Sequence, residues 1–169
     1  MNKQSIFFTC IVAIVAFALM LMLIQFLAAK LKVKPKTDDV INMSYSIWVG
    51  SLLVSFSIFL KIALDLTENA IEIIIYSKTI NNTFVAVMEK IAIFTGFSFL
   101  FTFLAYYTIT QILNLLTGNR SDSIEMEKNN FGYFTIKGLT LVMLTLSLST
   151  IFEHFLRWFM PAVGTPFYH

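Results

Sequence analysis

A short sequence pattern occurs twice in this chain, each time at the start of a long apolar run. Residues 42–50 (NMSYSIWVG) match residues 130–138 (NFGYFTIKG) at an asparagine, a tyrosine and a glycine with identical spacing. An earlier apolar run precedes each copy and carries Gln-Phe-Leu at Gln25 or Gln-Ile-Leu at Gln111. The pattern predicts a helix–loop–helix unit that has been duplicated.

The apolar runs are long enough to cross a bilayer. Hydrophobic residues make up 57% of the 169 residues and charged residues 13%, whereas soluble domains carry about 25% charged residues. A membrane helix needs about 20 apolar residues, and runs of this kind lie at 6–29, 43–60, 85–116 and 130–160. We therefore expect an all-α integral membrane protein of four transmembrane helices. It forms a single membrane domain, residues 1–169, with repeat one at 5–77 and repeat two at 84–161.

The second run acquires charges where it should leave the membrane. Lys61, Asp65, Glu68 and Glu72 are four, three and four residues apart, so they share one face if the helix continues. We expect an amphipathic or interfacial extension there, followed by a central loop. The polar, mixed-charge residues 119–129 are predicted to form the third loop.

Two helices per unit return the chain to the side on which it started, so the repeats are parallel and are related by an axis along the membrane normal. The first loop is rich in lysine, and the third adds Arg120 and Lys128. Positive charge concentrates in cytoplasmic loops. This distribution predicts that loops 31–41 and 118–129 are cytoplasmic and that both termini lie outside.

An acidic residue and an asparagine precede the second and the fourth helix, and a glycine follows eight residues after each asparagine. The positions are Asp39, Asn42 and Gly50 in the first unit, and Glu127, Asn130 and Gly138 in the second. We interpret the acids and asparagines as repeat caps, with Asp39 or Asn42 as the N-cap of the second helix.

This arrangement resembles the bacterial inner-membrane family called domain of unknown function 350, four-helix proteins with two similar halves. The likeness covers residues 6–163. The chain departs from the family in its many Phe and Met residues and in the charged stretch 61–72. The resemblance implies the bacterial inner (cytoplasmic) membrane and no known catalytic activity, and it transfers no active site.

Charged residues near the ends of the second and fourth helices form a candidate ion path or partner face. They are Lys61, Asp65, Glu68, Glu72, Glu153, His154 and Arg157. Ionisable groups inside membranes often mark ion or proton routes. The alternative is an interfacial salt-bridge network that fixes the helix ends, since Glu153 and Arg157 have the spacing of an ion pair.

Other polar or small residues lie deeper in the apolar runs. Lys137 is expected to extend its ammonium to the cytoplasmic surface; the alternatives are an acidic partner inside the bundle or an anionic headgroup. Gly50 and Gly138 are predicted to permit close helix packing. Gln25 and Gln111 are predicted to bond between helices, with a polar path as the alternative. The serine and threonine hydroxyls suggest packing surfaces, or else a polar pore.

The sequence offers no catalytic, cofactor-binding or metal-binding pattern, and its net charge of +2 is too small to indicate nucleic acid. We expect a non-enzymatic subunit whose partners are the lipid bilayer and either copies of itself or other envelope proteins, as in a membrane-stress or secretion assembly. The alternative is a small ion channel or transporter, with an axial pore in a homo-oligomer.

Overall fold

The computed structural model describes residues 3–31, 36–37, 40–76, 82–118 and 120–161. The elements follow in the order α1 (Lys3–Lys30), β1 (Lys36–Thr37), β2 (Val40–Ile41), α2 (Met43–Tyr76), α3 (Thr83–Thr117), α4 (Asp122–Glu127) and α5 (Phe131–Arg157). The two short strands pair antiparallel and form a small hairpin between α1 and α2. Within the described residues, the four long helices are each long and apolar enough to cross a membrane, which confirms the predicted all-α membrane architecture.

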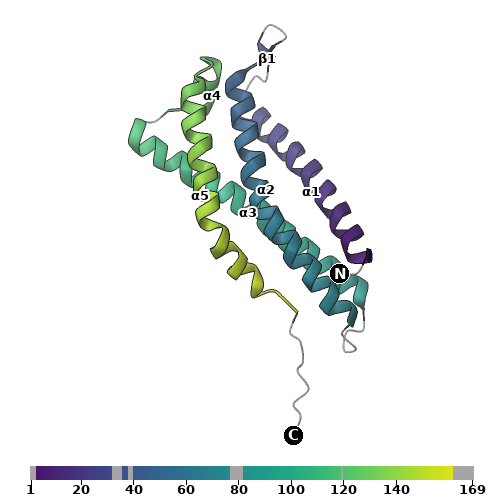
Figure 1. The fold of residues 1–169 in the computed structure, drawn as a ribbon. Helices are drawn as coiled ribbons and strands as arrows, with labels where there is room; N and C mark the ends of the chain where they lie inside the picture. The colour runs from purple at the N-terminus through teal and green to yellow at the C-terminus, as the bar shows by residue number, and fades with distance from the viewer. Residues whose placement is uncertain (1–2, 32–35, 38–39, 77–81, 119, 162–169) are drawn as a thin grey trace.

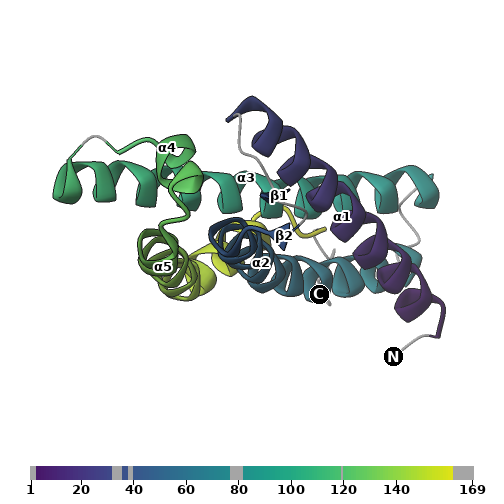
Figure 2. The ribbon, with the colours of Figure 1, turned by 90° about the horizontal axis from the view of Figure 1, so that it is seen from above.

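Helix α2 lies at the centre of the bundle. It packs against α1, α3 and α5, and Figure 1 shows it between α1 and α5, with α3 crossing behind. The C-terminal part of α3 projects past α5 in both views (Figures 1 and 2). Leu115 and Leu116 in that part are exposed. Because α1 buries few side chains, most of its surface faces outward, as expected of a helix in lipid.

The two polar turns lie at the same end of the bundle. The β1–β2 hairpin and α4 are close together at the top of Figure 1, and we call this the hairpin end. Asn42 Nδ2 donates to the backbone carbonyl of Met126 at 3.1 Å. The Ser44 hydroxyl donates to Asn129 Oδ1 at 3.0 Å. These bonds join the first and third connections directly.

Asparagine side chains satisfy backbone donors at the starts of three long helices, and this determines where those helices begin. Asn42 Oδ1 accepts from the Ser44 N–H at 2.9 Å. Asn82 and Asn130 accept in the same way from the N–H groups of Val85 and Tyr133. At the other end of α3, Gly118 adopts a positive φ of 79°, a conformation that glycine adopts without strain.

Helix α2 is a single helix of 34 residues. The charged stretch that we expected to form an interfacial extension continues the same helix as far as Tyr76. At about 1.5 Å per residue, such a helix is longer than the hydrocarbon thickness of about 30 Å. It therefore tilts or projects from the membrane at the end opposite the hairpin.

The predicted third loop contains a helix. Residues Asp122–Glu127 form α4, so describing residues 119–129 as a loop was incomplete. Its Glu125 and Met126 are buried against the bundle. Within the described residues, the apolar core beneath it forms two clusters. One lies toward the hairpin end around Trp48, Leu52 and Phe56, and the other lies around Phe59, Phe94 and Phe152.

Candidate functional site

Five polar and aromatic side chains meet under α4, and we call them the Asp122 cluster. They are Trp48 of α2, Tyr106 of α3, Asp122 of α4, and Tyr133 and Lys137 of α5. The side chains of Lys137 and Asp122 are only 2% and 8% exposed. The cluster therefore joins four helices around an ion pair that has almost no contact with solvent.

The Asp122 carboxylate is the acceptor at the centre of this cluster. Lys137 Nζ lies 2.7 Å from Oδ1 and 2.5 Å from Oδ2. Tyr133 Oη donates to Oδ1 at 3.0 Å, and Tyr106 Oη donates to Oδ2 at 2.5 Å. Trp48 Nε1 donates to Tyr106 Oη at 3.1 Å and so fixes the phenol. Charge-assisted hydrogen bonds of this kind are among the strongest in proteins.

Lys137 also lies over aromatic rings. Its ammonium is 4.5 Å from the centre of the Tyr106 ring and 5.9 Å from that of Tyr133. The negative face of an aromatic ring attracts a cation, more strongly when water is excluded. The expectation that this lysine would extend to the membrane surface was therefore wrong. Lys137 instead pairs with an acidic partner, Asp122, which was one of the alternatives. A buried ammonium needs such a counter-ion.

A second set of bonds holds α4 in place. Asn130 Nδ2 donates to Glu125 Oε2 at 2.6 Å, while its Oδ1 accepts from the Tyr133 N–H at 3.2 Å. Arg120 Nη1 lies 3.5 Å from Glu125 Oε1. Asn130 thus caps α5 and anchors α4 at the same time.

The candidate ion-path residues gather partly at the opposite end of the bundle. Asp65 and Asn69 of α2 and Glu153 and Arg157 of α5 line one pocket of about 230 Å³, together with Ile62 and Leu66. We call this pocket the Glu153 notch. Arg157 Nη2 donates to Glu153 Oε1 at 2.6 Å. These two side chains are 56% and 40% exposed, so the pair is an exposed salt bridge, and such pairs contribute little to stability.

The other members of that group do not line the notch. Lys61 and His154 are exposed on α2 and α5. Glu68 and Glu72 are half-buried on α2, and Glu68 Oε1 is buried with no hydrogen-bond partner within the described residues.

The predicted packing residues differ from one another in their surroundings. A Cβ added at Gly138 would lie 2.8 Å from Ser51 Cβ, so α5 and α2 approach each other closely there. A Cβ added at Gly50 would meet no atom within 4 Å, so Gly50 does not mediate a close contact among the residues that the structure describes. Gln25 and Gln111 are exposed on α1 and α3.

Of the predicted repeat caps, Asn42 and Asn130 make the cap bonds described above. Glu127 is exposed at the last position of α4 and caps no helix start. Asp39 lies outside the described residues.

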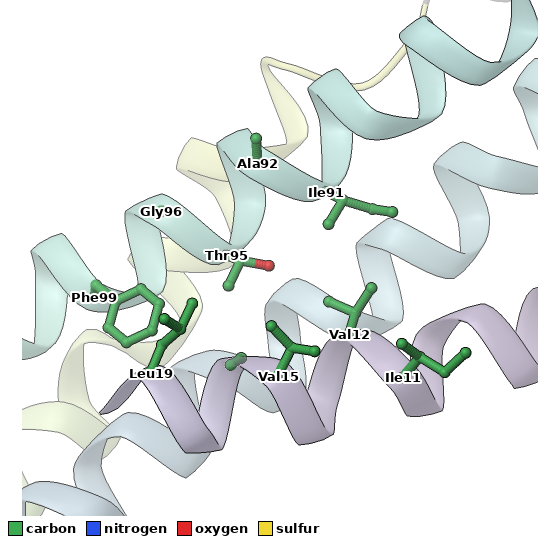
Figure 3. Close-up of a pocket in the computed structure, with 10 residues that line it drawn as sticks. Ile11, Val12, Val15, Leu19, Ile91, Ala92, Thr95, Gly96 and Phe99 are labelled. Carbon is green, nitrogen blue, oxygen red and sulfur yellow. The ribbon is translucent and has the colours of Figure 1, made fainter. Parts of the chain in front are cut away.

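An apolar cavity of about 370 Å³ lies between α1 and α3. Figure 3 shows Ile11, Val12 and Val15 of α1 facing Ile91 and Thr95 of α3 across it. The Thr95 hydroxyl is the polar group among these side chains, and it has no hydrogen-bond partner in the described part of the chain. Such a lining suits an apolar occupant and offers no chemistry.

The sequence patterns did not identify Asp122, Tyr106 or Trp48 as site residues. A signal was nevertheless present, because Lys137 lies in an apolar helix and needs a counter-ion, and the neighbouring connection supplies Asp122, Glu125 and Glu127. No group of three metal-binding side chains occurs among the residues with described positions. Comparisons of this chain with protein-family models, curated proteins and solved structures found no match.

Proposed function

We propose that this chain is a non-enzymatic integral membrane subunit that works by associating with other transmembrane helices, either in copies of itself or in an envelope complex. The observation that carries this proposal is an unused small-residue surface on α3. Ala92 and Gly96 are both exposed and lie one helical turn apart. A Cβ added at Gly96 would meet no atom within 4 Å.

Small residues four apart allow membrane helices to approach closely, and this is a common basis of their association. Among the described residues, Gly138 serves such an approach and Gly96 does not. The cavity beside Gly96 adds an apolar recess between α1 and α3 (Figure 3). This surface therefore suits a helix from outside the described bundle.

The interior of the bundle supports association over transport. Between the Asp122 cluster and the Glu153 notch lie two apolar clusters, in which Phe56, Phe59 and Phe152 are fully buried. The buried hydroxyls there mostly bond their own helices; for example, Thr102 donates to the Ser98 carbonyl and Thr145 to the Leu141 carbonyl. They do not line a polar path across the core of a single chain.

We place the protein in the bacterial inner membrane, with the hairpin end in the cytoplasm. The lysines of the first loop and the resemblance to domain of unknown function 350 support this location. The parallel duplication belongs to the same proposal. In its support, Asp65 and Glu153, which the two repeats equate, line one notch between α2 and α5.

The test is the Gly96→Leu variant, compared with Gly132→Leu. Both positions are exposed helical glycines, and Gly132 has only the Asn130 side chain near its missing Cβ, at 3.6 Å. After mild detergent extraction, native mass measurement should find the wild-type chain and Gly132→Leu in assemblies, and Gly96→Leu mainly as single chains. A wild-type chain that is monomeric and free of other proteins would exclude the proposal.

The Glu153 notch favours a second candidate, a cation channel formed around the axis of a homo-oligomer. Its two carboxylates would attract cations at the mouth of such a pore. Ion flux into proteoliposomes tests this function. Flux that is absent, or that is unchanged by Asp65→Asn combined with Glu153→Gln, would exclude it.

A further inference from the structure

We propose that the Asp122 cluster is a phosphate-type anion site that the chain closes with its own carboxylate, and that α4 is a displaceable plug over this site. Three groups donate to the Asp122 carboxylate: Lys137 Nζ and the hydroxyls of Tyr106 and Tyr133. All three donors belong to the long helices α3 and α5, whereas the acceptor belongs to α4. If α4 moved away, the donors would stay and would present an anion cradle.

The cradle is held in shape without α4. Trp48 of α2 donates to Tyr106 Oη, and the Tyr106 ring lies under the Lys137 ammonium. Each of these groups belongs to a helix of 27 residues or more. The donors are therefore carried by packed helices, and Tyr106 and Lys137 contact each other without the help of the carboxylate that now occupies the site.

Helix α4 has the properties of a separable element. It has only six residues, and its N-cap Ser121 makes no side-chain cap bond. Isolated helices this short are not stable in water, so α4 depends on its contacts with the bundle. Apart from buried Met126, the contacts of α4 described above are polar: the bonds of Asp122 within the cluster, Asn42 to the Met126 carbonyl, and Asn130 and Arg120 to the buried Glu125. Water can replace such bonds at the end of the bundle.

Electrostatics couples the opening of α4 to an incoming anion. A buried ammonium that loses its counter-ion is strongly unfavourable, so α4 should leave Lys137 only when another anion replaces Asp122. Phosphate offers several acceptor oxygens and a charge that suits an ammonium and two phenol donors. Arg120 and Lys128 are exposed on either side of α4 and would attract anions to this end. The source of the phosphate is a lipid headgroup or the free ion.

The position of α4 can be monitored with a thiol. In a Cys10→Ser background, Met126→Cys places the reporter at a site that is 2% exposed while α4 is docked. The full-length protein is held in micelles of an uncharged, phosphate-free detergent, and the rate of labelling by a soluble thiol reagent is measured. One arm adds inorganic phosphate, with chloride at equal ionic strength as its reference. The other arm adds phosphatidylglycerol to the micelles.

We expect the labelling rate to rise about tenfold when the anion is present at about ten times its dissociation constant for the open state, in which α4 is undocked. Binding to the open state increases the population of that state in proportion to the anion concentration. A rise with phosphate identifies the free ion as a ligand, and a rise only with phosphatidylglycerol identifies the headgroup. Lys137→Met should abolish either response, while Lys61→Met, a change at an exposed lysine, should preserve it. Tyr106→Phe and Tyr133→Phe keep both rings and should weaken the response.

No rise in either arm would overturn the proposal. An equal rise with chloride, or an undiminished response in Lys137→Met, would overturn it too, because either result would mean a general ionic effect on α4. If Lys137→Met does not fold, the two Tyr→Phe variants decide. An undiminished response in both of them together would then reject the anion site.

Discussion

The ammonium of Lys137 lies 2.5 and 2.7 Å from the two carboxylate oxygens of Asp122, and both side chains are almost completely buried. Lys137 is on a helix that is apolar enough to cross a membrane, whereas Asp122 is on the short helix α4 that precedes it. An ion pair of this kind fixes α4 on the bundle and also balances a charge that lipid would not tolerate. It connects the membrane-spanning part of the chain to its polar end.

The buried pair should show strong energetic coupling. Removing one partner by Lys137→Met or by Asp122→Leu leaves an uncompensated buried charge, which costs about 3–5 kcal/mol. The double variant should lose much less stability than the sum of the losses in the two single variants. Unfolding free energies measured in detergent for the four proteins give the coupling.

The Glu153–Arg157 pair provides a matched control for that cycle. Its side chains are 40% and 56% exposed, so the same cycle with Glu153→Gln and Arg157→Met should give a coupling of about 0.5 kcal/mol or less. Equal coupling for the two pairs would contradict the burial of Lys137 and Asp122.

The contact of Gly138 with Ser51 should not tolerate a larger residue. An added Cβ would lie 2.8 Å from Ser51 Cβ, so α2 and α5 would have to separate, and Gly138→Ala should cost about 1–3 kcal/mol. Gly50→Ala should be neutral or stabilising by up to about 1 kcal/mol, since alanine is the better helix former and no atom lies nearby. Thermal unfolding in detergent measures both changes.

The same contact can be tested by rescue. Ser51→Gly removes the atoms that the new methyl group would meet, so combining it with Gly138→Ala should restore part of the lost stability. If the double variant is no more stable than the sum of the two single changes predicts, the clash with Ser51 is not the cause of the lost stability.

Asn130 should matter for two elements at once. Asn130→Ala removes the cap bond to the Tyr133 N–H and the bond to Glu125, and the loss of a cap costs about 0.5–2 kcal/mol. Asn130→Asp keeps a capping oxygen but places a second carboxylate beside Glu125, so it should recover little of the stability. Asn69→Ala, at an exposed position inside α2, is the control and should change the unfolding free energy by less than about 0.5 kcal/mol.

The asparagine positions also illustrate which features of the fold could be predicted from the sequence. The four spans follow from run length and hydropathy, which are local properties. Helix starts are equally local, because an asparagine before an apolar run can accept from N–H groups two or three residues later. Asn42 and Asn130 make such bonds. These features do not depend on which helices pack together.

The features that were missed depend on contacts between distant residues. Helix α4 is short and polar, so no apolar period marks it, and its docking on the bundle stabilises it. Lys137 was assigned to the membrane surface because its counter-ion lies in another element, 15 residues away in the chain. The Glu153 notch likewise required knowing that α2 and α5 are neighbours.

Labelling of cysteines from one side of the membrane tests most directly that the chain crosses four times with both polar turns at one end. In a Cys10→Ser background, cysteines replace Lys30, Lys128 and Tyr76, which are all exposed. A thiol reagent that cannot cross the membrane should label positions 30 and 128 from one side of the membrane and position 76 from the other side. Labelling of 30 and 128 from opposite sides would contradict the fold in the membrane, as would labelling of all three from the same side.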